Sequence, residues 1–274
     1  MSDTLGSSLA TDVATEPTSA GNLRGRTILI TGASSGVGRH LALMLGASGA
    51  NVICCARRAD LLDDVVQAIS AAGGQAMAQA CDVSDQASIG AAFDAATARF
   101  GVIDSIIANA GINHAGPAAK VSTESLDALL GVNLRGGFLT AQEGARRLIA
   151  EGGPSSPRRI IFIASILGLR PQAGAALYAS TKAGIIMLAK GLALEWAKYD
   201  ITVNAICPGF MPTDIADDWL ASEAGRLTVS RWPRKRAMPL AELDSSVLFL
   251  LGAGSGSVTG NALVVDDGQS LASA

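Results

Sequence analysis

The segment from Arg26 to Gly38 reads RTILITGASSGVG and joins an apolar run to a glycine-rich turn. An apolar run of this kind is typical of a strand that is covered on both faces. Gly32 permits the tight turn, Gly36 lets the backbone approach a pyrophosphate, and Gly38 lets the following helix pack on the sheet. A phosphate group is expected at the amino end of that helix. The segment therefore predicts the nucleotide-binding turn of a parallel α/β fold.

Short apolar runs alternate with amphipathic stretches along the rest of the chain. The further runs are NVICCA (51–56), QAMAQA (75–80), VIDSIIA (102–108), RRIIFIA (158–164), ITVNAI (201–206) and ALVVD (262–266). Helices are expected between them, including one long helix that runs through Asn133 to about Ala150. Right-handed crossovers wind such a series into one sheet. We predict a single Rossmann-type domain over residues 25–274, with a doubly wound parallel sheet of about seven strands.

The bulk composition limits the classes of protein that remain. The chain has 274 residues, 49% of them hydrophobic and 16% charged, with a net charge of −3. This is enough apolar material for a large core, and the charge argues against a nucleic-acid partner. Residues 1–24 have the composition of a disordered tail and lack the features of a signal peptide or membrane span. No membrane or metal partner is expected. The chain has four cysteines, Cys54, Cys55, Cys81 and Cys207, which fit a reduced cytoplasmic protein.

The sequence YASTK contains the best candidate for acid/base chemistry. Tyr178 and Lys182 are four residues apart, so a helix places both side chains on one face. A free tyrosine titrates near about 10. One positive charge at about 4 Å, at an effective dielectric constant of roughly 20, is worth on the order of 4 kcal/mol. We therefore expect Lys182 to lower the pKa of Tyr178 toward neutrality, where a general acid or base works best. The two histidines, His40 and His114, lie in no recognisable catalytic setting.

These motifs, in this order, resemble those of the single-domain short-chain dehydrogenase/reductase family, over roughly Leu23 to Leu271. A lone YxxxK pattern is weak evidence, but the ordered set of glycine turn, NAG, VN, S, YxxxK and PG is specific. The resemblance implies that Tyr178 exchanges a proton with the substrate oxygen while a nicotinamide cofactor exchanges hydride. It implies that Lys182 lowers the pKa of the tyrosine and holds the nicotinamide ribose. It further implies that Ser165, in IIFIASILG, hydrogen-bonds the reacting oxygen and that Asn133, in GVNLRG, holds a water of a proton relay.

The same resemblance implies a cofactor site at the carboxyl ends of the strands. Asp82 matches an aspartate that binds the adenine amino group, although a place in a helix N-terminal cap is the alternative. Asn109, Ala110 and Gly111 match the NAG that supports the sheet, and Thr213 matches a threonine that holds the nicotinamide carboxamide. The full set of expected cofactor residues is Gly32, Ser34, Ser35, Gly36, Val37, Gly38, Arg57, Arg58, Asp82, Val83, Asn109, Ala110, Gly111, Tyr178, Lys182, Pro208, Gly209 and Thr213.

The end of the second apolar run, NVICCARR, bears on the choice of cofactor. Enzymes that prefer NAD usually place a carboxylate here to bind the ribose hydroxyls, and that carboxylate repels a 2′-phosphate. This chain has Ala56, followed by Arg57 and Arg58. Arg57 can pair with the phosphate through its planar fork, and Arg58 adds positive charge. We expect NADP(H) to be preferred, with NAD(H) as the alternative if both arginines are merely solvated.

The substrate side is less clearly marked. Residues 213–240 occupy the position of a mobile lid. Candidates for an apolar substrate pocket beside Ser165 and Tyr178 are Ile166, Leu167, Phe210, Met211, Trp219 and Trp232, although each of these six could equally be ordinary core or lid packing. The basic run of Arg231, Arg234, Lys235 and Arg236 could meet the phosphate of an acyl carrier or of CoA, although such a run is more often a solvated face. The segment VVDDGQSL departs from the aspartate and two glycines found in most relatives.

Three functions follow from these observations. The first is an oxidoreductase acting on an apolar ketone or secondary alcohol with NADP(H). The second is a 3-oxoacyl thioester reductase, with the thioester on acyl carrier protein or CoA. The third is a dinucleotide-binding regulator without catalytic activity, which would have no need of the activated phenol. The family resemblance also implies a homotetramer or homodimer in which the helices near residues 133 and 182 pack across subunits.

Overall fold

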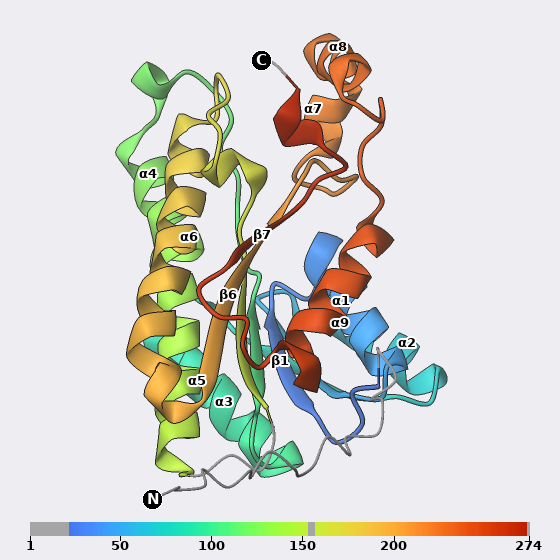
Figure 1. Cartoon of the computed structure of the whole chain (residues 1–274), viewed down its shortest axis with the longest axis vertical. Helices are drawn as coiled ribbons and strands as arrows, with labels where there is room; N and C mark the ends of the chain where they lie inside the picture. Colours follow the sequence, from blue (N-terminus) through green and yellow to red (C-terminus); the bar gives the residue numbers. More distant parts are fainter. Residues whose placement is uncertain (1–21, 153–156, 273–274) are drawn as a thin grey trace, which may run out of the picture.

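The molecule is one parallel sheet between two layers of helices (Figure 1). The computed structural model describes residues 22–152 and 157–272, so most of the expected N-terminal tail at 1–24 lies outside the described residues. The strands are β1 (Thr27–Thr31), β2 (Asn51–Ala56), β3 (Gln75–Ala80), β4 (Ser105–Ala108), β5 (Arg158–Ile163), β6 (Ile201–Pro208) and β7 (Ala262–Val265). They form a seven-stranded sheet in the order β3-β2-β1-β4-β5-β6-β7. The prediction of a Rossmann-type doubly wound sheet is confirmed.

Successive strand residues point to opposite faces and enter two separate cores. Leu29, Ile53 and Ile106 belong to the core beneath α3 (Gln86–Phe100), α5 (Gly137–Ala150) and α6 (Ala176–Trp196). Their neighbours Ile28, Val52 and Ile107 belong to the core beneath α1 (Gly36–Ala47), α2 (Ala59–Ala71) and α9 (Asp244–Leu251). This two-sided burial explains why the inner strands β1, β2, β4, β5 and β6 are largely apolar, because neither face of the sheet meets water there, whereas the edge strands β3 and β7 are partly exposed.

The predicted long helix through Asn133 is interrupted. It begins as α4 (Thr123–Leu129), continues as a π-helical segment, η2 (Leu130–Gly136), and resumes as α5. The prediction of one regular helix was therefore wrong at its centre, because apolar periodicity does not distinguish an α-turn from a π-turn. Such π-bulges are frequent at functional sites.

Helix α6 is long and apolar enough to cross a membrane by length and composition, with a mean hydropathy of 1.2 over its best window. Its contacts are those of a core helix instead. Ile185, Ala189 and Leu192 are buried in the core against the sheet, and Tyr178 and Lys182 near its start line the main cavity. This evidence for a membrane span is therefore weak.

Two short helices, α7 (Asp217–Ala221) and α8 (Glu223–Arg231), form a hairpin above the carboxyl end of β6 (Figure 1). Ser222 joins them: its hydroxyl accepts from Gly225 N at 3.0 Å and donates to Trp219 O at 2.7 Å. This hairpin makes up most of the segment 213–240 that the sequence marks as a lid.

Candidate active site

A cavity of about 740 Å³ lies at the carboxyl ends of the strands. This is the place where open parallel sheets bind ligands. The expected site residues that line it are Gly32, Ser34, Ser35, Gly36, Val37, Arg57, Arg58, Asp82, Val83, Asn109, Ala110, Gly111, Ser165, Leu167, Tyr178, Lys182, Pro208, Gly209, Phe210, Met211 and Thr213. Segments from six different strand ends thus come together around one space.

The glycine turn forms one end of this cavity. Gly32 and Gly36 adopt left-handed backbone angles, with φ of 70° and 51°. A side chain on Gly32 would come within 2.9 Å of Ala110 Cα, so only glycine allows this close approach. Ser35 is the N-cap of α1 without forming a side-chain cap bond, which leaves the first N–H groups of the helix available to an anion. The turn therefore fits a pyrophosphate group.

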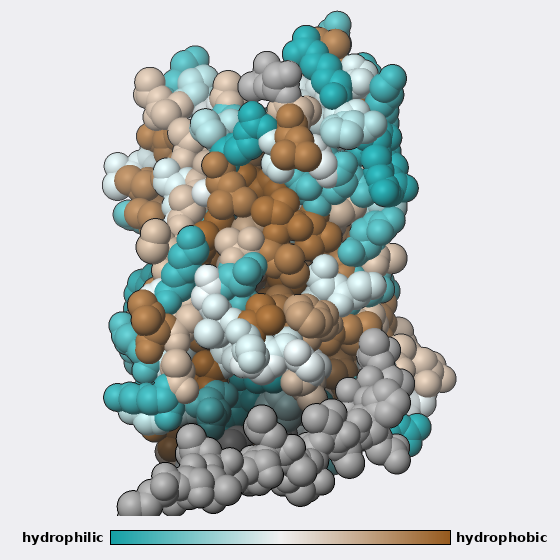
Figure 2. Space-filling view, viewed as in Figure 1, coloured by the Kyte–Doolittle hydropathy of each residue, from teal (hydrophilic) through white to brown (hydrophobic). Residues whose placement is uncertain are grey.

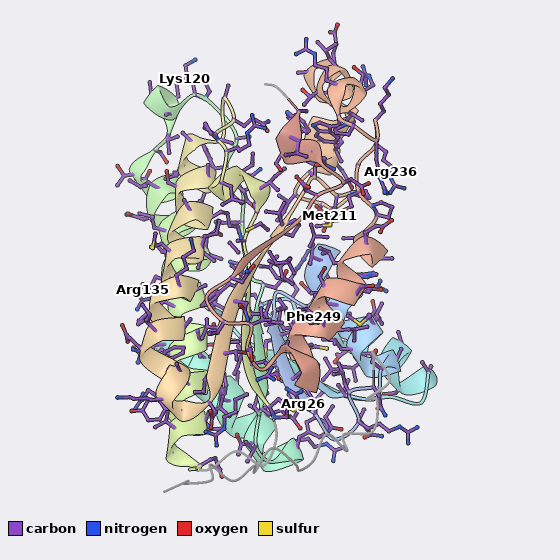
Figure 3. The ribbon with its side chains drawn as sticks, viewed as in Figure 1. Arg26, Lys120, Arg135, Met211, Arg236 and Phe249 are labelled. Carbon is purple, nitrogen blue, oxygen red and sulfur yellow. The ribbon has the colours of Figure 1, made fainter. Side chains whose placement is uncertain are left out.

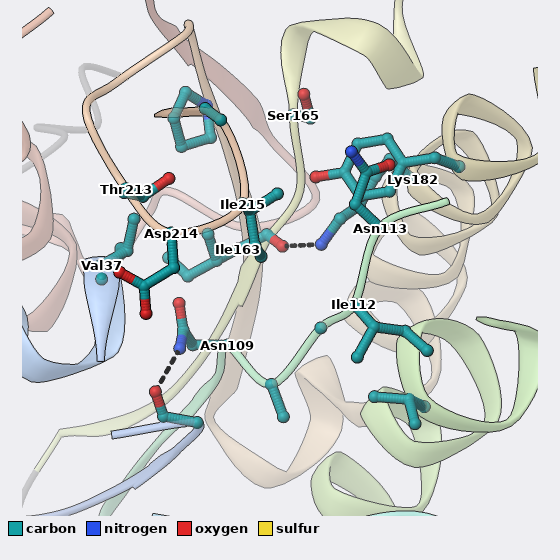
Figure 4. Close-up of a pocket in the computed structure, with 18 of the residues that line it drawn as sticks. Val37, Asn109, Ile112, Asn113, Ile163, Ser165, Lys182, Thr213, Asp214 and Ile215 are labelled. Atoms are coloured by element: carbon teal, nitrogen blue, oxygen red, sulfur yellow. Dashed lines mark hydrogen bonds between the residues drawn. The ribbon is translucent and has the colours of Figure 1, made fainter. Parts of the chain in front are cut away.

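Asn109 ties the neighbouring strand end to the turn. Its amide Nδ2 donates to Thr31 O at 2.9 Å and to Gly32 O at 3.2 Å, and the bond to Gly32 is drawn in Figure 4. Asn109 N and Ala110 N both donate to Thr31 Oγ1 at 3.1 Å. Gly38 lies behind the cavity surface, where an added Cβ would come within 2.1 Å of Gly32 O. These contacts give the NAG segment and Gly38 a structural role in shaping the floor of the site.

The two arginines after β2 have different surroundings. Arg58 donates from one guanidinium nitrogen to Ser34 Oγ and Ser35 Oγ, at 3.1 Å each, so it lies directly against the glycine turn. Arg57 is close enough to Asp82 to contribute to the lowering of that carboxyl's pKa, after the larger effect of hydrogen bonds from Ser84. In the sequence-based prediction, Arg57 has the main role and Arg58 only adds positive charge. The structure instead fixes Arg58 more firmly, through its two hydrogen bonds.

Asp82 does not cap the following helix. Its Oδ1 accepts from Ser84 N at 2.9 Å and Ser84 Oγ at 2.7 Å, whereas Asp85 is the N-cap of α3 and accepts from Ala87 N. Asp82 faces the cavity, which agrees with a part in cofactor binding.

Tyr178 and Lys182 meet at the centre of the cavity. Lys182 Nζ lies 5.6 Å from the centre of the Tyr178 ring and donates to Ile163 O at 2.8 Å (Figure 4). Burial raises the pKa of Tyr178 to about 12, with a hydrogen bond from Ser165 acting in the opposite direction. Burial also lowers the pKa of Lys182 to about 8.

The expectation that Lys182 lowers the pKa of Tyr178 toward neutrality was wrong for the protein alone. The helical spacing does bring the two groups together, but the ammonium is bonded to a backbone carbonyl. Both groups are also removed from water, which disfavours the charged form of each. Tyr178 is consequently a protonated phenol at neutral pH.

Ser165 begins the short helix η3 (Ile166–Gly168), and its hydroxyl accepts from Leu167 N at 3.1 Å. This bond uses a lone pair and leaves the hydroxyl proton free to point into the cavity. Ile166, expected as a pocket residue, is buried beneath this turn and does not line the cavity, whereas Leu167 does.

Asn133 lies behind the cavity surface in the π-helical segment and is 2% exposed. Its Oδ1 accepts from Ile112 N at 2.8 Å, and its Nδ2 donates to Ile112 O at 2.9 Å and Thr181 Oγ1 at 3.2 Å. The side chain therefore fixes the loop after Gly111 to helix α6 next to Lys182. Both Nδ2 hydrogens are used in these bonds, so a relay water could bind this residue only as a donor, to the second lone pair of Oδ1 or to the backbone carbonyl.

Sequence reasoning missed several lining residues. Ile112, Asn113, Ala115 and Gly116 follow the NAG segment, while Gln172 to Ala175 precede α6. The two loops are joined by a bond from Gly116 N to Gly174 O at 2.9 Å. The sequence did offer a signal for these loops, because one directly follows an expected strand and the other directly precedes the helix that carries Tyr178 and Lys182.

Comparisons with known proteins agree with this geometry. A family model described as short chain dehydrogenase matches residues 26–224. The chain belongs to the short-chain dehydrogenase family. A 3beta-hydroxysteroid dehydrogenase from Eggerthella lenta is 37% identical to it, over 91% of this chain and 95% of that protein. A 3-oxoacyl-acyl-carrier-protein reductase from Thermotoga maritima is 32% identical, over 90% and 98%.

Solved structures of the family have the same fold. A gluconate 5-dehydrogenase from Burkholderia cenocepacia, in complex with NADP and tartrate, matches with a TM-score of 0.87 and 33% identity, over 93% of this chain and 98% of that one. The chain is accordingly an oxidoreductase of a family that binds NAD or NADP and acts on small molecules. The reading as a regulator without catalytic activity finds no support here.

Proposed function

We propose that this short-chain dehydrogenase reduces an apolar, uncharged ketone, or oxidises the matching secondary alcohol, with NADP(H). The observation that carries the proposal is the protonated Tyr178 phenol beside Ser165, in a cavity whose outer wall is formed by Phe210, Met211 and Trp219. The proton donor and an apolar surface thus share one space.

The charges around the cavity support an uncharged substrate. Among the described residues that line it, the cations are Arg57, Arg58 and Lys182. The two arginines lie at the glycine-turn end, and Lys182 is bonded to Ile163 O. Asp214 also lines the cavity and would repel a carboxylate. A sugar acid would therefore lack a cationic partner at the outer wall.

The alternative, a 3-oxoacyl thioester reductase, depends on the basic run near residue 234 binding a carrier phosphate. Arg234 and Arg236 are both paired with Asp267, at 3.2 and 2.9 Å, and Arg236 also with Glu242 at 3.3 Å. Half of the basic run is thus already neutralised. This favours a carrier-free ketone over a thioester on acyl carrier protein or CoA.

The cofactor preference rests on the end of β2. Ala56 provides no carboxylate to bind the ribose hydroxyls or repel a 2′-phosphate, and Arg58, Ser34 and Ser35 together present donors beside the glycine turn. A nicotinamide cofactor, when bound, supplies or accepts the hydride. Tyr178 donates the proton to the substrate oxygen, Ser165 hydrogen-bonds that oxygen, and Lys182 holds a positive charge beside the phenol ring.

Replacement of Tyr178 by phenylalanine tests the proposed role. Tyr178→Phe should reduce kcat/KM for a bicyclic ketone such as 1-tetralone by about 10²- to 10⁴-fold, because it removes the transferable proton. The Kd for NADPH, measured by fluorescence titration, should stay within about threefold of the wild-type value, since the ring remains. Retention of more than about a tenth of the wild-type rate would contradict the assignment. So would a sugar acid proving the best substrate in the same screen.

Two further expectations belong to the proposal. Four buried, free cysteines support a reduced, cytoplasmic location. Exposed apolar side chains on α6, α9 and β7, among them Met187, Leu194, Phe249 and Val264, support a homotetramer or homodimer. Figure 2 shows the apolar surface in the middle of the face that β6 and β7 present. Light scattering of the purified protein would measure the assembly directly.

A further inference from the structure

The C-terminal segment Asp266–Leu271 contacts the expected lid at two separate places. It directly follows β7 and ends in a short helix, η7 (Gln269–Leu271). Asp266 folds it into a compact turn, because its carboxylate accepts from Gly268 N at 2.9 Å and from Ser270 N at 2.7 Å. Within this turn, Asp267 and Gln269 both point toward the segment 210–238.

Gln269 hydrogen-bonds the backbone of Phe210 at the base of the lid. Its Oε1 accepts from Phe210 N at 2.7 Å, and its Nε2 donates to Phe210 O at 3.2 Å. The same carbonyl accepts from Met238 N at 2.9 Å, so the two stems of the lid are bonded to each other at this point. Gln269 is 4% exposed, and a Cβ on Gly209 would lie 2.6 Å from its Oε1. The amide is therefore enclosed and matched to the backbone of Phe210.

Asp267 binds the C-terminal stem of the lid, which follows α8. Its carboxylate, largely buried, pairs through Oδ1 with Arg234 at 3.2 Å and through Oδ2 with Arg236 at 2.9 Å. Figure 3 shows Arg236 beside the strand of chain that descends from the α7–α8 hairpin. Asp267 adopts a φ of 54°, a left-handed conformation that glycine adopts more readily. The backbone at Asp267 is therefore strained, and the side chain at this position forms two ion pairs with the lid.

The residues bound by Gln269 and Asp267 are next to the aromatic wall of the cavity, which is formed by Phe210 and Trp219. The Phe210 ring is stacked on Trp219 at 4.5 Å and on Trp232 at 5.5 Å, measured between ring centres. Trp232 is nearly fully buried against Phe210 and Trp219, and the latter two residues line the cavity. A shift of Phe210, or of the segment that carries Trp232, would move the surface that an apolar substrate meets.

We propose that Asp267 and Gln269 are positioning residues for substrate: they form a C-terminal latch that holds the lid and its Phe210–Trp219 wall against the cavity. The proposal rests on the proposed function for its choice of an apolar ketone as probe. The latch itself is a contact between two parts of the chain and can be measured without substrate.

The test compares Asp267→Asn, Gln269→Leu and Arg236→Gln, each in a Trp196→Phe background, where Trp219 and Trp232 are the remaining tryptophans. Asp267→Asn keeps a side chain that tolerates positive φ and removes the charge. Arg231→Gln is the matched control, because Arg231 is exposed, belongs to the same basic run, and forms no ion pair among the described residues. Acrylamide quenching reports the exposure of the lid tryptophans in each protein.

Quenching constants should rise by about twofold or more in the three latch variants and stay at the background value in Arg231→Gln. KM for 1-tetralone should rise about three- to tenfold, the equivalent of one weakened ion-pair or hydrogen-bond contact, with kcat and the Kd for NADPH within about twofold. A general loss of structure would change kcat and cofactor affinity as well. If the quenching constants of Asp267→Asn and Arg236→Gln equal that of the Trp196→Phe background protein, the latch is overturned, even if Gln269→Leu fails to fold. If even the unmutated enzyme leaves every ketone unreacted, the proposed function fails, and quenching alone decides the latch.

Discussion

Lys182 is a buried cation, and its titration should make the unfolding free energy of the protein depend on pH. Its pKa is lowered to about 8 in the folded chain, from an ordinary value of 10.5. Below pH 8 the lysine is charged in both states, and the folded state bears the full cost of burying the charge. Between pH 8 and 10.5 the folded state binds fewer protons than the unfolded state, so stability rises with pH through this window.

A Lys182→Met variant lacks this dependence. Between pH 7.5 and 9.5 the unfolding free energy of the wild type should therefore rise by about 2 kcal/mol relative to the variant. Tyr178, whose pKa is raised to about 12, lowers the unfolding free energy only above pH 10, and its effect cancels because it is present in both proteins. Urea unfolding at the two pH values measures the difference. A difference that does not change with pH would show that Lys182 titrates at its ordinary value.

The residues proposed to select the cofactor lie at the end of β2. Charge-assisted hydrogen bonds of about 1.5 to 3 kcal/mol imply a roughly ten- to hundredfold preference for NADP(H) in kcat/KM. The double variant Ala56→Asp, Arg57→Ala should move the enzyme toward NAD(H). Arg58→Gln should lower kcat/KM with NADPH and leave that with NADH unchanged, because Arg58 is the arginine held by Ser34 and Ser35. Equal use of both cofactors by the wild type would remove these residues from the site.

Two helical glycines differ in the space around them: one is closely packed and the other is not. A Cβ on Gly38, in α1, would lie 2.1 Å from Gly32 O, whereas one on Gly90, in α3, meets nothing within 4 Å. Gly38→Ala should therefore destabilise the protein by about 3 kcal/mol or more, since backbone must move. Gly90→Ala should stabilise it by about 0.5 to 1 kcal/mol, because alanine is the better helix former. Thermal unfolding measures both, and a harmless Gly38→Ala would contradict the close approach of α1 to the turn.

The elements show why the sequence predicted the sheet well and the site less completely. Strands buried on both faces, such as Ile28 to Ile30 of β1, are apolar throughout and are therefore easy to place. The π-turn at Leu130–Gly136 depends on a shift of backbone bonding that leaves no periodic mark. The pKa of Tyr178 depends on burial, which the i, i+4 spacing to Lys182 does not reveal. The bond that Phe210 N donates to Gln269 Oε1 joins residues 59 positions apart and follows from no local pattern.

The molecule as a whole holds its cavity between the glycine turn at one end and the lid at the other. Arg58 lines it at the first end and Trp219 at the second, and the proposed dinucleotide site begins at the Arg58 end. A ligand that binds only the folded state, present at about 100 times its Kd, stabilises that state by about 2.7 kcal/mol. For a chain of this size that corresponds to a rise in Tm of roughly 5 to 10 °C.

NADP at this concentration should therefore raise Tm by roughly 5 to 10 °C in the wild type. NAD at the same concentration, if bound ten- to hundredfold more weakly, contributes about 0.4 to 1.4 kcal/mol and a correspondingly smaller rise. Arg58→Gln should bring the NADP shift down to that of NAD, while Arg231→Gln, on the exposed basic run, should leave it unchanged. Differential scanning calorimetry of the four protein–cofactor pairs measures the shifts. Equal shifts with both cofactors would contradict a 2′-phosphate site at Arg58, because the 2′-phosphate is the group in which the two cofactors differ.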